Sequence, residues 1–339
     1  MKIVHYICVL AVLYGTVGAT AQERGRQTLV VTASNTSENS LLVYDTSGRL
    51  VQTVATRGKG GVSGNAGAIA VSRDRLAVLN FGSDNVSTFS VWQDGLVLDR
   101  VVPTVSGPVS VAFGHHHLYV LGATKVESLP VFDFGVSSDP DGVADLVKAD
   151  GSAAQVGVLK TQLVVTEKSN AIETVDLASD GAVTGVAALV SNIPSNVNTP
   201  FGLVTRDNEA YVTIAHANEI SLVRNDTVLT TTGSGTQSAP CWLALDGPFL
   251  FSSNSPSLSV SRYVVYGQKI IQDAAVAASF SGDPTDIAYR SGLAAVIDGT
   301  GSISHLTVFT VDEDGNLTRK AVATINSTAN GVAIIRADE

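Results

Sequence analysis

The side chains best placed for proton transfer are Glu167, Lys168 and His216, because each stands at the end of an apolar run. An adjacent carboxylate and amine can act as an acid–base pair when burial brings both groups towards neutral pKa values. An imidazole titrates near neutrality without such help. We therefore predict catalytic roles for Glu167, Lys168 and His216. The alternatives are an ion pair at a strand end and an ordinary loop histidine.

A second group of residues offers surfaces and hydrogen bonds to a bound molecule. An indole ring stacks on flat substrates, while amide and carboxylate groups fix orientation. The predicted substrate-binding residues are Trp242, Phe201, Asn80, Asn254 and Asp298, and Glu219, Cys241 and Asp286 share their placement at the ends of apolar runs. Cys241 is also a conceivable nucleophile, although no His or Asn arrangement stands near it. Packing between structural elements is the alternative for Trp242 and Cys241.

The triplet His115, His116 and His117 suggests a metal site. On a strand its first and third members would share a side, but a dedicated site needs another ligand from elsewhere. Other repeats carry turn residues here, so we expect a turn, away from the ligand site. Residues 312–315 resemble a calcium loop only slightly, and no phosphate loop, nucleotide fingerprint, GxSxG elbow or zinc spacing is present. We therefore predict no metal and no cofactor.

Residues 1–21 have the pattern of a signal peptide, with Lys2 at the start, an apolar core and small residues before a cleavage site at Ala21. The apolar core is shorter than the roughly 20 residues that a membrane-spanning helix needs. We therefore expect a protein that is secreted or lies in the lumen of the secretory pathway. Residues 22–339 would form a single domain without membrane contact.

Composition limits the partners of the chain. The formal net charge of -10 and the lack of a basic cluster argue against nucleic acid as a partner. Of the two cysteines, Cys8 lies in the leader, so the mature chain has no internal disulfide and depends on a large apolar core. We expect a monomer. The sequons predict a glycoprotein, with acceptors at Asn35, Asn85, Asn225, Asn316 and Asn326.

A repeated unit places these candidates on a common framework. It consists of an apolar strand, a tight turn and a second strand, as in AIAVSRDRLAVLN from Ala68 and SVAFGHHHLYVL from Ser110. Equivalent apolar positions recur 40 to 47 residues apart, at Ile69, Val111, Val156, Leu203, Leu243, Ile287 and Val332. This period is typical of β-propeller blades.

Between these units lies a second hairpin, with Asp-Gly or Ser-Gly pairs at its tip, as in LLVYDTSGRLVQT and IETVDLASDGAVTGV. Two hairpins make one four-stranded blade, so we predict an all-β, seven-bladed β-propeller. Residues 28–33 lack an inner strand before them, and residues 331–337 lack outer strands after them. We predict that these two strands pair and close the ring.

Several stretches carry a family resemblance in order along the chain: LAVLNFGSDNVSTFSV at 76, SGPVSVAFGHHHLYVL at 106, QLVVTEKSNAIETV at 162, TPFGLV at 199 and PCWLAL at 240. The chain resembles the secreted seven-bladed lactonase-like propellers, a group related to bacterial 6-phosphogluconolactonase and fungal 3-carboxymuconate cyclase. The resemblance implies chemistry by His, Glu and Arg in the channel. The corresponding stretch AAQVGVLKTQ holds no His, only Glu167 can be proposed as a channel acid, and Arg is sparse on the inner strands. Sugar phosphates and tricarboxylates are therefore not expected as substrates.

The chain also looks like the short, secreted fungal propellers that include hetero-Diels-Alderases. That likeness implies cyclisation or cycloaddition of a small hydrophobic substrate in secondary-metabolite biosynthesis. Such chemistry needs close positioning more than a strong nucleophile. We predict this cofactor-free enzyme first and a lactonase or cycloisomerase second. A non-catalytic secreted binding propeller is the third possibility.

Overall fold

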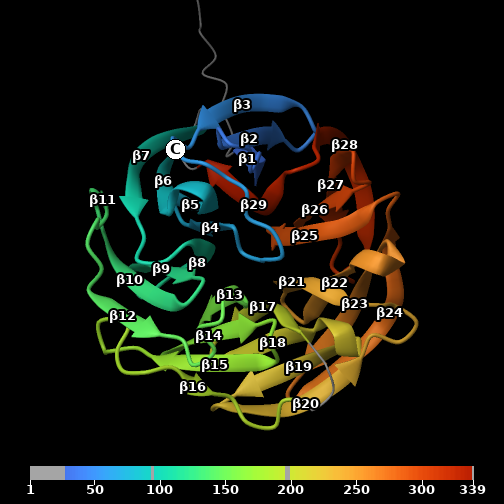
Figure 1. Ribbon diagram of the computed structural model, residues 1–339. Helices are drawn as coiled ribbons and strands as arrows, with labels where there is room; N and C mark the ends of the chain where they lie inside the picture. Colours follow the sequence, from blue (N-terminus) through green and yellow to red (C-terminus); the bar gives the residue numbers. More distant parts are fainter. Residues whose placement is uncertain (1–26, 93–94, 195–198, 338–339) are drawn as a thin grey trace, which may run out of the picture.

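Seven antiparallel sheets stand as blades around a central axis in the computed structural model of the chain (Figure 1). The structure describes residues 27–92, 95–194 and 199–337. The chain is thus a seven-bladed β-propeller, and the predicted fold class is confirmed. The leader predicted at residues 1–21 lies outside the described residues. In the described part, no helix is long and apolar enough to cross a membrane.

The strands of the first four blades follow one another from the axis outwards. Blade 1 contains β29 (Asn330–Ala337), β1 (Gln27–Ala33), β2 (Ser40–Asp45) and β3 (Leu50–Ala55). Blade 2 contains β4 (Ile69–Ser72), β5 (Arg75–Asn80), β6 (Asn85–Trp92) and β7 (Gly95–Pro103). Blade 3 contains β8 (Pro108–Gly114), β9 (His117–Gly122), β10 (Lys125–Phe132), β11 (Gly135–Val136) and β12 (Gly142–Asp145). Blade 4 contains β13 (Ala153–Val158), β14 (Gln162–Glu167), β15 (Ala171–Asp176) and β16 (Ala188–Leu189).

The remaining blades have the same order. Blade 5 contains β17 (Pro200–Arg206), β18 (Glu209–Ile214), β19 (Glu219–Arg224) and β20 (Thr227–Gly233). Blade 6 contains β21 (Pro240–Asp246), β22 (Phe249–Asn254), β23 (Ser259–Tyr266) and β24 (Lys269–Ser279). Blade 7 contains β25 (Asp283–Arg290), β26 (Leu293–Gly299), β27 (Ile303–Val311) and β28 (Leu317–Asn326). Short 3-10 turns join the second and third strands of three blades: η1 (Phe81–Ser83), η2 (Ala215–Ala217) and η3 (Ser255–Ser257).

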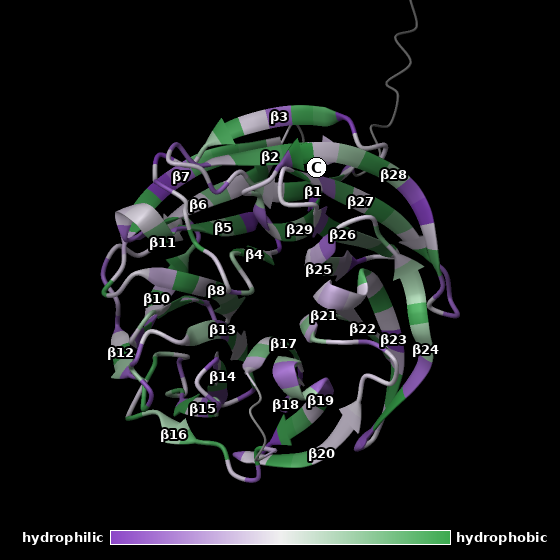
Figure 2. Cartoon of the chain, turned by 45° about the vertical axis from the view of Figure 1, so that its right-hand side comes forward, coloured by the Kyte–Doolittle hydropathy of each residue, from purple (hydrophilic) through white to green (hydrophobic). Residues whose placement is uncertain are grey.

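Ring closure occurs in blade 1, as predicted. The last strand, β29, pairs antiparallel with β1, so that Val30 lies opposite Ile334. Val30 and Ile334 pack towards blade 7, whereas Val31 and Ile335 pack towards blade 2. Both faces of each blade are therefore buried, which explains why the strands are continuous apolar runs. Figure 2 shows these hydrophobic strands in green and many of the turns in purple.

The outer hairpins of blades 3 and 4 are less regular than the sequence predicts. Blade 3 carries an additional short strand, and β16 of blade 4 has only two residues. After the turn at Gly181 the chain bridges back at Val183 to Leu177, and it pairs with β15 as a strand only at Ala188 and Leu189. Blade 3 also holds this turn. The hydroxyl of Tyr119 donates to the Gly181 carbonyl (2.7 Å), and the Val183 N–H donates to Ser128 Oγ (2.9 Å). Val183 is buried beside Tyr119.

Most of the innermost strands have a β-bulge near their first residue. Register shifts occur in β8, β13, β17, β21 and β25. Four of these strands carry proline at the shift, where no ladder N–H is required: Pro108, Pro200, Pro240 and Pro284. A bulge turns the following side chain out of the regular alternation. Gln155, Trp242 and Asp286 follow such bulges and reach the central channel.

Candidate functional site

Residues 56–68, which link β3 to β4, cross one mouth of the central channel, and we call them the cover segment. Figure 1 shows this segment in blue, looping between β29 and β4 towards the middle of the ring. The Asn65 side-chain amide donates to the Val109 carbonyl of blade 3 (2.8 Å), and the Ala66 N–H donates to the Ala154 carbonyl of blade 4 (3.1 Å). Trp242 Nε1 of blade 6 donates to the Asn65 carbonyl (3.2 Å). Contacts with blades 3, 4 and 6 are possible because the segment spans the channel.

The cover segment depends on glycine for its close fit. Five of its thirteen residues are glycines. Gly67 has φ +70°, and a Cβ there would lie 2.7 Å from Ser110 Oγ. A Cβ on Gly60 would lie 2.3 Å from the Asn35 carbonyl carbon. Larger residues at these positions would lift the segment away from the blades.

A cavity of about 140 Å³ lies under the cover segment. Its walls come from five blades, with Ala66 and Gly67 of the cover as a further part of its lining. The described residues that line it include Gln155, Trp242 and Asp286 but no Lys, Arg or His. The volume is below the roughly 300–1,000 Å³ of pockets that hold drug-sized ligands. With the cover in place, the cavity has room for no more than one small molecule.

Asp286 is the titratable group of this cavity. Its carboxylate accepts hydrogen bonds from the backbone N–H groups of Ile287 (2.8 Å) and Val332 (3.0 Å). Burial raises the pKa of Asp286 to about 7, although these two bonds oppose the shift. The group therefore exchanges a proton in the neutral range, as a general acid or base requires.

Gln155 supplies a hydrogen-bond donor at the same cavity. Its Oε1 accepts a hydrogen bond from the Leu203 N–H (2.7 Å). The side-chain amide nitrogen therefore points away from Leu203. That nitrogen would lie 3.4 Å from a Cβ on Gly67 and so is directed towards the cover. The amide is thereby fixed in one orientation, as a donor to developing negative charge should be.

Trp242 and Phe201 form the aromatic corner of the site. Their rings meet edge to face, with centroids 5.1 Å apart and an interplanar angle of 89°. Trp242 lines the cavity, whereas Phe201 is buried in a small apolar cluster with Ala66, Ala154 and Ala215. Both predicted residues thus lie at the covered mouth, where the Trp242 indole also holds the cover.

Glu167 lies outside the channel cavity. It is completely buried at the end of β14, and its Oε2 accepts from Ser152 Oγ (2.7 Å). Its Oε1 has no hydrogen-bond partner among the described residues. Burial raises the pKa of Glu167 to about 7, and the nearby carboxylates of Glu173 and Asp150 add to the shift. The carboxyl group does not line the described cavity, and its catalytic role stays a prediction.

The predicted acid–base pair is not assembled. Lys168 Nζ donates to the Gly64 carbonyl (2.6 Å). Among the described residues Lys168 forms no salt bridge with Glu167, although each charge shifts the pKa of the other. Burial lowers the pKa of Lys168. His216 lies in η2 at the surface, with Nδ1 2.8 Å from Thr199 Oγ1. Lys168 therefore anchors the cover segment, and neither Lys168 nor His216 lines the cavity.

Asn80 and Asn254 are completely buried within their blades rather than open to the channel. Asn80 Oδ1 accepts from Thr56 Oγ1 (2.7 Å), and its Nδ2 donates to Asn85 Oδ1 (2.8 Å). Asn254 Nδ2 donates to Ser261 Oγ (2.8 Å). These side-chain amides link the second and third strands of their blades. Their hydrogen bonds are made within the protein, so they do not form part of a ligand site. Asp298, at the equivalent place in blade 7, borders a different cavity.

Cys241 packs beside the aromatic corner. Its thiol donates to the Ala239 carbonyl (3.2 Å), and burial raises its pKa to about 11. A thiol in this state is a poor nucleophile at neutral pH. Glu219 has one buried carboxylate oxygen without a partner among the described residues and does not line the channel cavity.

The histidine triplet lies at the opposite face, as expected. β8 starts beside the cover segment and runs away from it, so its turn at His115 and His116 is at the far end. His117 is buried, with Nε2 2.8 Å from Asp141 Oδ2. Within residues 27–92, 95–194 and 199–337, no group of three His, Cys, Asp or Glu side chains could hold a metal ion.

The predicted glycan acceptors differ in environment. Asn225 and Asn316 lie on exposed turns. Asn35, Asn85 and Asn326 donate their amides to backbone carbonyls and are partly buried. Attachment of a glycan remains a prediction, and Asn225 and Asn316 are the acceptors that the fold leaves most accessible.

Fold and site together define a seven-bladed β-propeller with a covered channel and a buried carboxylic acid beneath the cover. No protein-family model matches the chain, and no curated protein matches its sequence. Solved structures of low sequence identity share the fold.

Three of these solved structures show how similar their folds are to that of this chain. A periplasmic gluconolactonase from Pseudomonas aeruginosa has a TM-score of 0.67 and 15% identity, covering 92% of this chain and 99% of that chain. A Bacteroides fragilis protein named as a candidate 6-phosphogluconolactonase also has a TM-score of 0.67, at 13% identity, with 93% and 99% covered. A virginiamycin B lyase from Staphylococcus aureus, with quinupristin, has a TM-score of 0.54 and 14% identity, with 80% and 92% covered. At such identities the likeness shows the fold. The resemblance to lactonase-like propellers is confirmed at that level, and the one to hetero-Diels-Alderases is not.

Sequence reasoning misses the cover segment and undervalues Asp286. The signal for the cover is thirteen residues with five glycines between two strands, since loops of this length are usually functional. Asp286 stands at the end of an apolar run, like the other candidates. A single sequence does not show that the β-bulge before Asp286 turns its side chain into the channel.

Proposed function

We propose that the protein opens a small, uncharged lactone with water in the covered cavity, and that Asp286 is its general base and general acid. The observation that carries this proposal is a carboxyl group whose burial raises its pKa to about 7, located in a cavity of about 140 Å³. A proton-transfer group is most effective when its pKa is close to the working pH.

The chemistry follows from the groups around the cavity. The ionised Asp286 carboxylate removes a proton from water while the water oxygen bonds to the lactone carbonyl carbon. The amide nitrogen of Gln155 donates a hydrogen bond to the developing oxyanion. The ring C–O bond then breaks, and Asp286 returns the proton to the departing ring oxygen. The product is an open hydroxy acid, and the carboxylate is regenerated.

Charge defines the substrate class. A phosphorylated or carboxylated lactone would require cationic partners, and the described lining of the cavity has none. An anionic substrate would also meet the Asp286 carboxylate. We therefore assign a neutral lactone, and the names of the gluconolactonase-type structural neighbours support the reaction type by analogy of fold alone.

Cycloaddition is the second candidate, and the aromatic corner of Trp242 and Phe201 is the observation that favours it. A reaction between two organic partners needs room for both, and about 140 Å³ is small even for one drug-sized molecule. Such a reaction would require the cover to leave the channel. We also propose that residues 1–21 direct export, as their pattern predicts.

Acid release from a lactone panel tests the proposal. The protein is incubated with δ-valerolactone, glucono-δ-lactone and 6-phosphogluconolactone, and the release of acid is compared with a reaction without protein. We expect faster opening of the neutral lactones and at least a tenfold lower rate for the phosphorylated one. Rates equal to the blank for all three, or a preference for the phosphorylated lactone, would contradict the proposal.

A further inference from the structure

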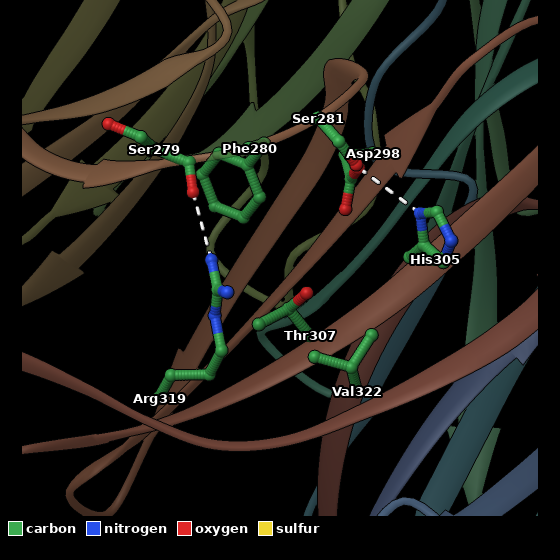
Figure 3. Close-up of a pocket in the computed structure, with 8 residues that line it drawn as sticks. All are labelled: Ser279, Phe280, Ser281, Asp298, His305, Thr307, Arg319 and Val322. Atoms are coloured by element: carbon green, nitrogen blue, oxygen red, sulfur yellow. Dashed lines mark hydrogen bonds and ion pairs between the residues drawn. The ribbon is translucent and has the colours of Figure 1, made fainter.

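A second cavity, of about 280 Å³, lies between blades 6 and 7 and shares no lining residue with the channel cavity (Figure 3). Its walls come from the end of β24, the segment after it, and β26, β27 and β28. Figure 3 shows Asp298 and His305 on one side and Arg319 on the other, with Thr307 between them. The cavity therefore presents both signs of charge within one hollow.

Asp298 and His305 form the inner pair of this cavity. They are register partners on β26 and β27, with His305 Nδ1 3.4 Å from Asp298 Oδ2. Asp298 is only 3% exposed, and burial raises its pKa, while His305 opposes that shift. The buried carboxylate is held in place by this pair and by the Gly282 N–H.

Blade 7 differs at this register position from blades 2 and 6, which carry buried amides there. Blade 4 carries Glu167 opposite Ala171. The equivalent register pairs are Asn80 with Asn85 in blade 2 and Asn254 with Ser259 in blade 6. Those amides are satisfied by neighbouring side chains inside the blade. In blade 7 the ionisable pair Asp298 and His305 takes the place of these neutral side chains and borders a cavity. Strand pairing alone does not require that change.

Arg319 and Phe280 complete the site. One guanidinium nitrogen of Arg319 donates to the Ser279 carbonyl (2.9 Å), which keeps the group at the cavity. The guanidinium has five N–H donors, so others remain for a ligand. The Phe280 ring is fixed edge to face against Phe309, with centroids 6.0 Å apart, and it also lines the cavity.

We propose that this cavity binds a small hydroxylated carboxylate. Arg319 pairs with the carboxylate, because a guanidinium matches two carboxylate oxygens. Asp298 accepts hydrogen bonds from ligand hydroxyls, and Phe280 covers the ligand C–H face. A phosphate dianion would place its additional charge near Asp298, so a monoanion with hydroxyls fits best. The proposal does not depend on the function of the channel.

Calorimetric titration with D-gluconate tests the proposal, with D-sorbitol as the ligand that lacks the carboxylate and hexanoate as the one that lacks hydroxyls. We expect gluconate to bind at least tenfold more tightly than either. No gluconate binding, or equal binding of sorbitol or hexanoate, would overturn the assignment. Inorganic phosphate binding more tightly than gluconate would overturn it as well.

Variants locate the binding. Arg319→Gln should weaken gluconate at least tenfold, and Asp298→Asn should weaken it several-fold, while both keep the wild-type melting temperature within a few degrees. Arg49→Gln is the matched control, since Arg49 is another exposed arginine, paired with Asp45. Asp286→Asn separates this site from the channel, and gluconate binding should be unchanged in it. Loss of binding in Asp286→Asn with retention in Arg319→Gln would show that gluconate occupies the channel instead.

Discussion

Asp286 and Glu167 are both buried carboxyl groups with a pKa raised to about 7, yet their surroundings differ. Asp286 is held by two backbone N–H groups at the wall of a cavity. Glu167 is bound by Ser152, and its second oxygen has no partner among the described residues. The comparison teaches that burial raises the pKa of a carboxyl group whether or not a ligand can reach it. An adjacent space for a ligand is what makes the proton useful.

The largest expected effect separates the two carboxyl groups by activity. Asp286→Asn should lower the rate of lactone opening at least hundredfold, because it removes the group that transfers the proton. Glu167→Gln should keep the wild-type rate within about threefold, since Glu167 does not line the cavity. Initial rates on glucono-δ-lactone, normalised to folded protein, make this comparison.

The asparagine variant requires a folding control. Its amide can accept from only one of the two N–H groups that bind Asp286, and we expect a loss of roughly 1–2 kcal/mol of stability. Thermal melting at the assay pH shows whether the variant is still folded. Equal activity losses in Asp286→Asn and Glu167→Gln would remove the distinction between the two carboxyl groups.

A smaller effect concerns stability and pH. The fold favours protonated Glu167, because its pKa is raised from 4.5 to about 7. This contribution to stability is fully present below pH 4.5 and is lost as the pH rises through 7. Glu167→Gln has no such proton to lose. Between pH 5 and 8 its stability should therefore fall by about 2 kcal/mol less than that of the wild type.

Urea unfolding at several pH values measures this difference. Part of the wild-type decrease belongs to Asp286, whose pKa is raised in the same direction, so the variant should still lose some stability. Parallel curves for wild type and Glu167→Gln would mean that Glu167 is not tuned by burial.

The smallest effect concerns the cover segment. It closes the cavity at Asp286, whereas Glu167 lies outside that cavity. Trp242→Phe removes the hydrogen bond from Nε1 to the Asn65 carbonyl, at a cost of about 1 kcal/mol. Hydrogen exchange of the Ala66 N–H, which is bonded to Ala154, should be about fivefold faster as the cover opens more often.

Trp92→Phe is the control for the cover, because Trp92 is an exposed tryptophan on the outer part of blade 2. Exchange at Ala66 should be unchanged in that variant. If Trp242→Phe leaves the exchange rate unchanged too, the indole does not hold the cover.

The sequence predicts the ring much better than the site, for a physical reason. Repeated apolar positions from Ile69 to Val332 report local strand pairing and packing between blades, so they reveal the propeller and its closure. The contact of Trp242 with Asn65 joins residues 177 positions apart, and no local pattern encodes it. The sequence indicates that burial could raise the pKa of Glu167. It does not indicate that Glu167 lies outside the channel cavity. Lys168 likewise stands beside Glu167 in sequence and binds the cover instead.

The pH dependence of lactone opening tests the central claim most directly. If Asp286 is the proton-transfer group, the rate should rise with pH to a plateau, with a midpoint near its pKa of about 7. The same midpoint should be found in Glu167→Gln. A rate that does not change between pH 5 and 9 after subtraction of the uncatalysed reaction, or a midpoint that disappears in Glu167→Gln, would contradict the assignment of Asp286.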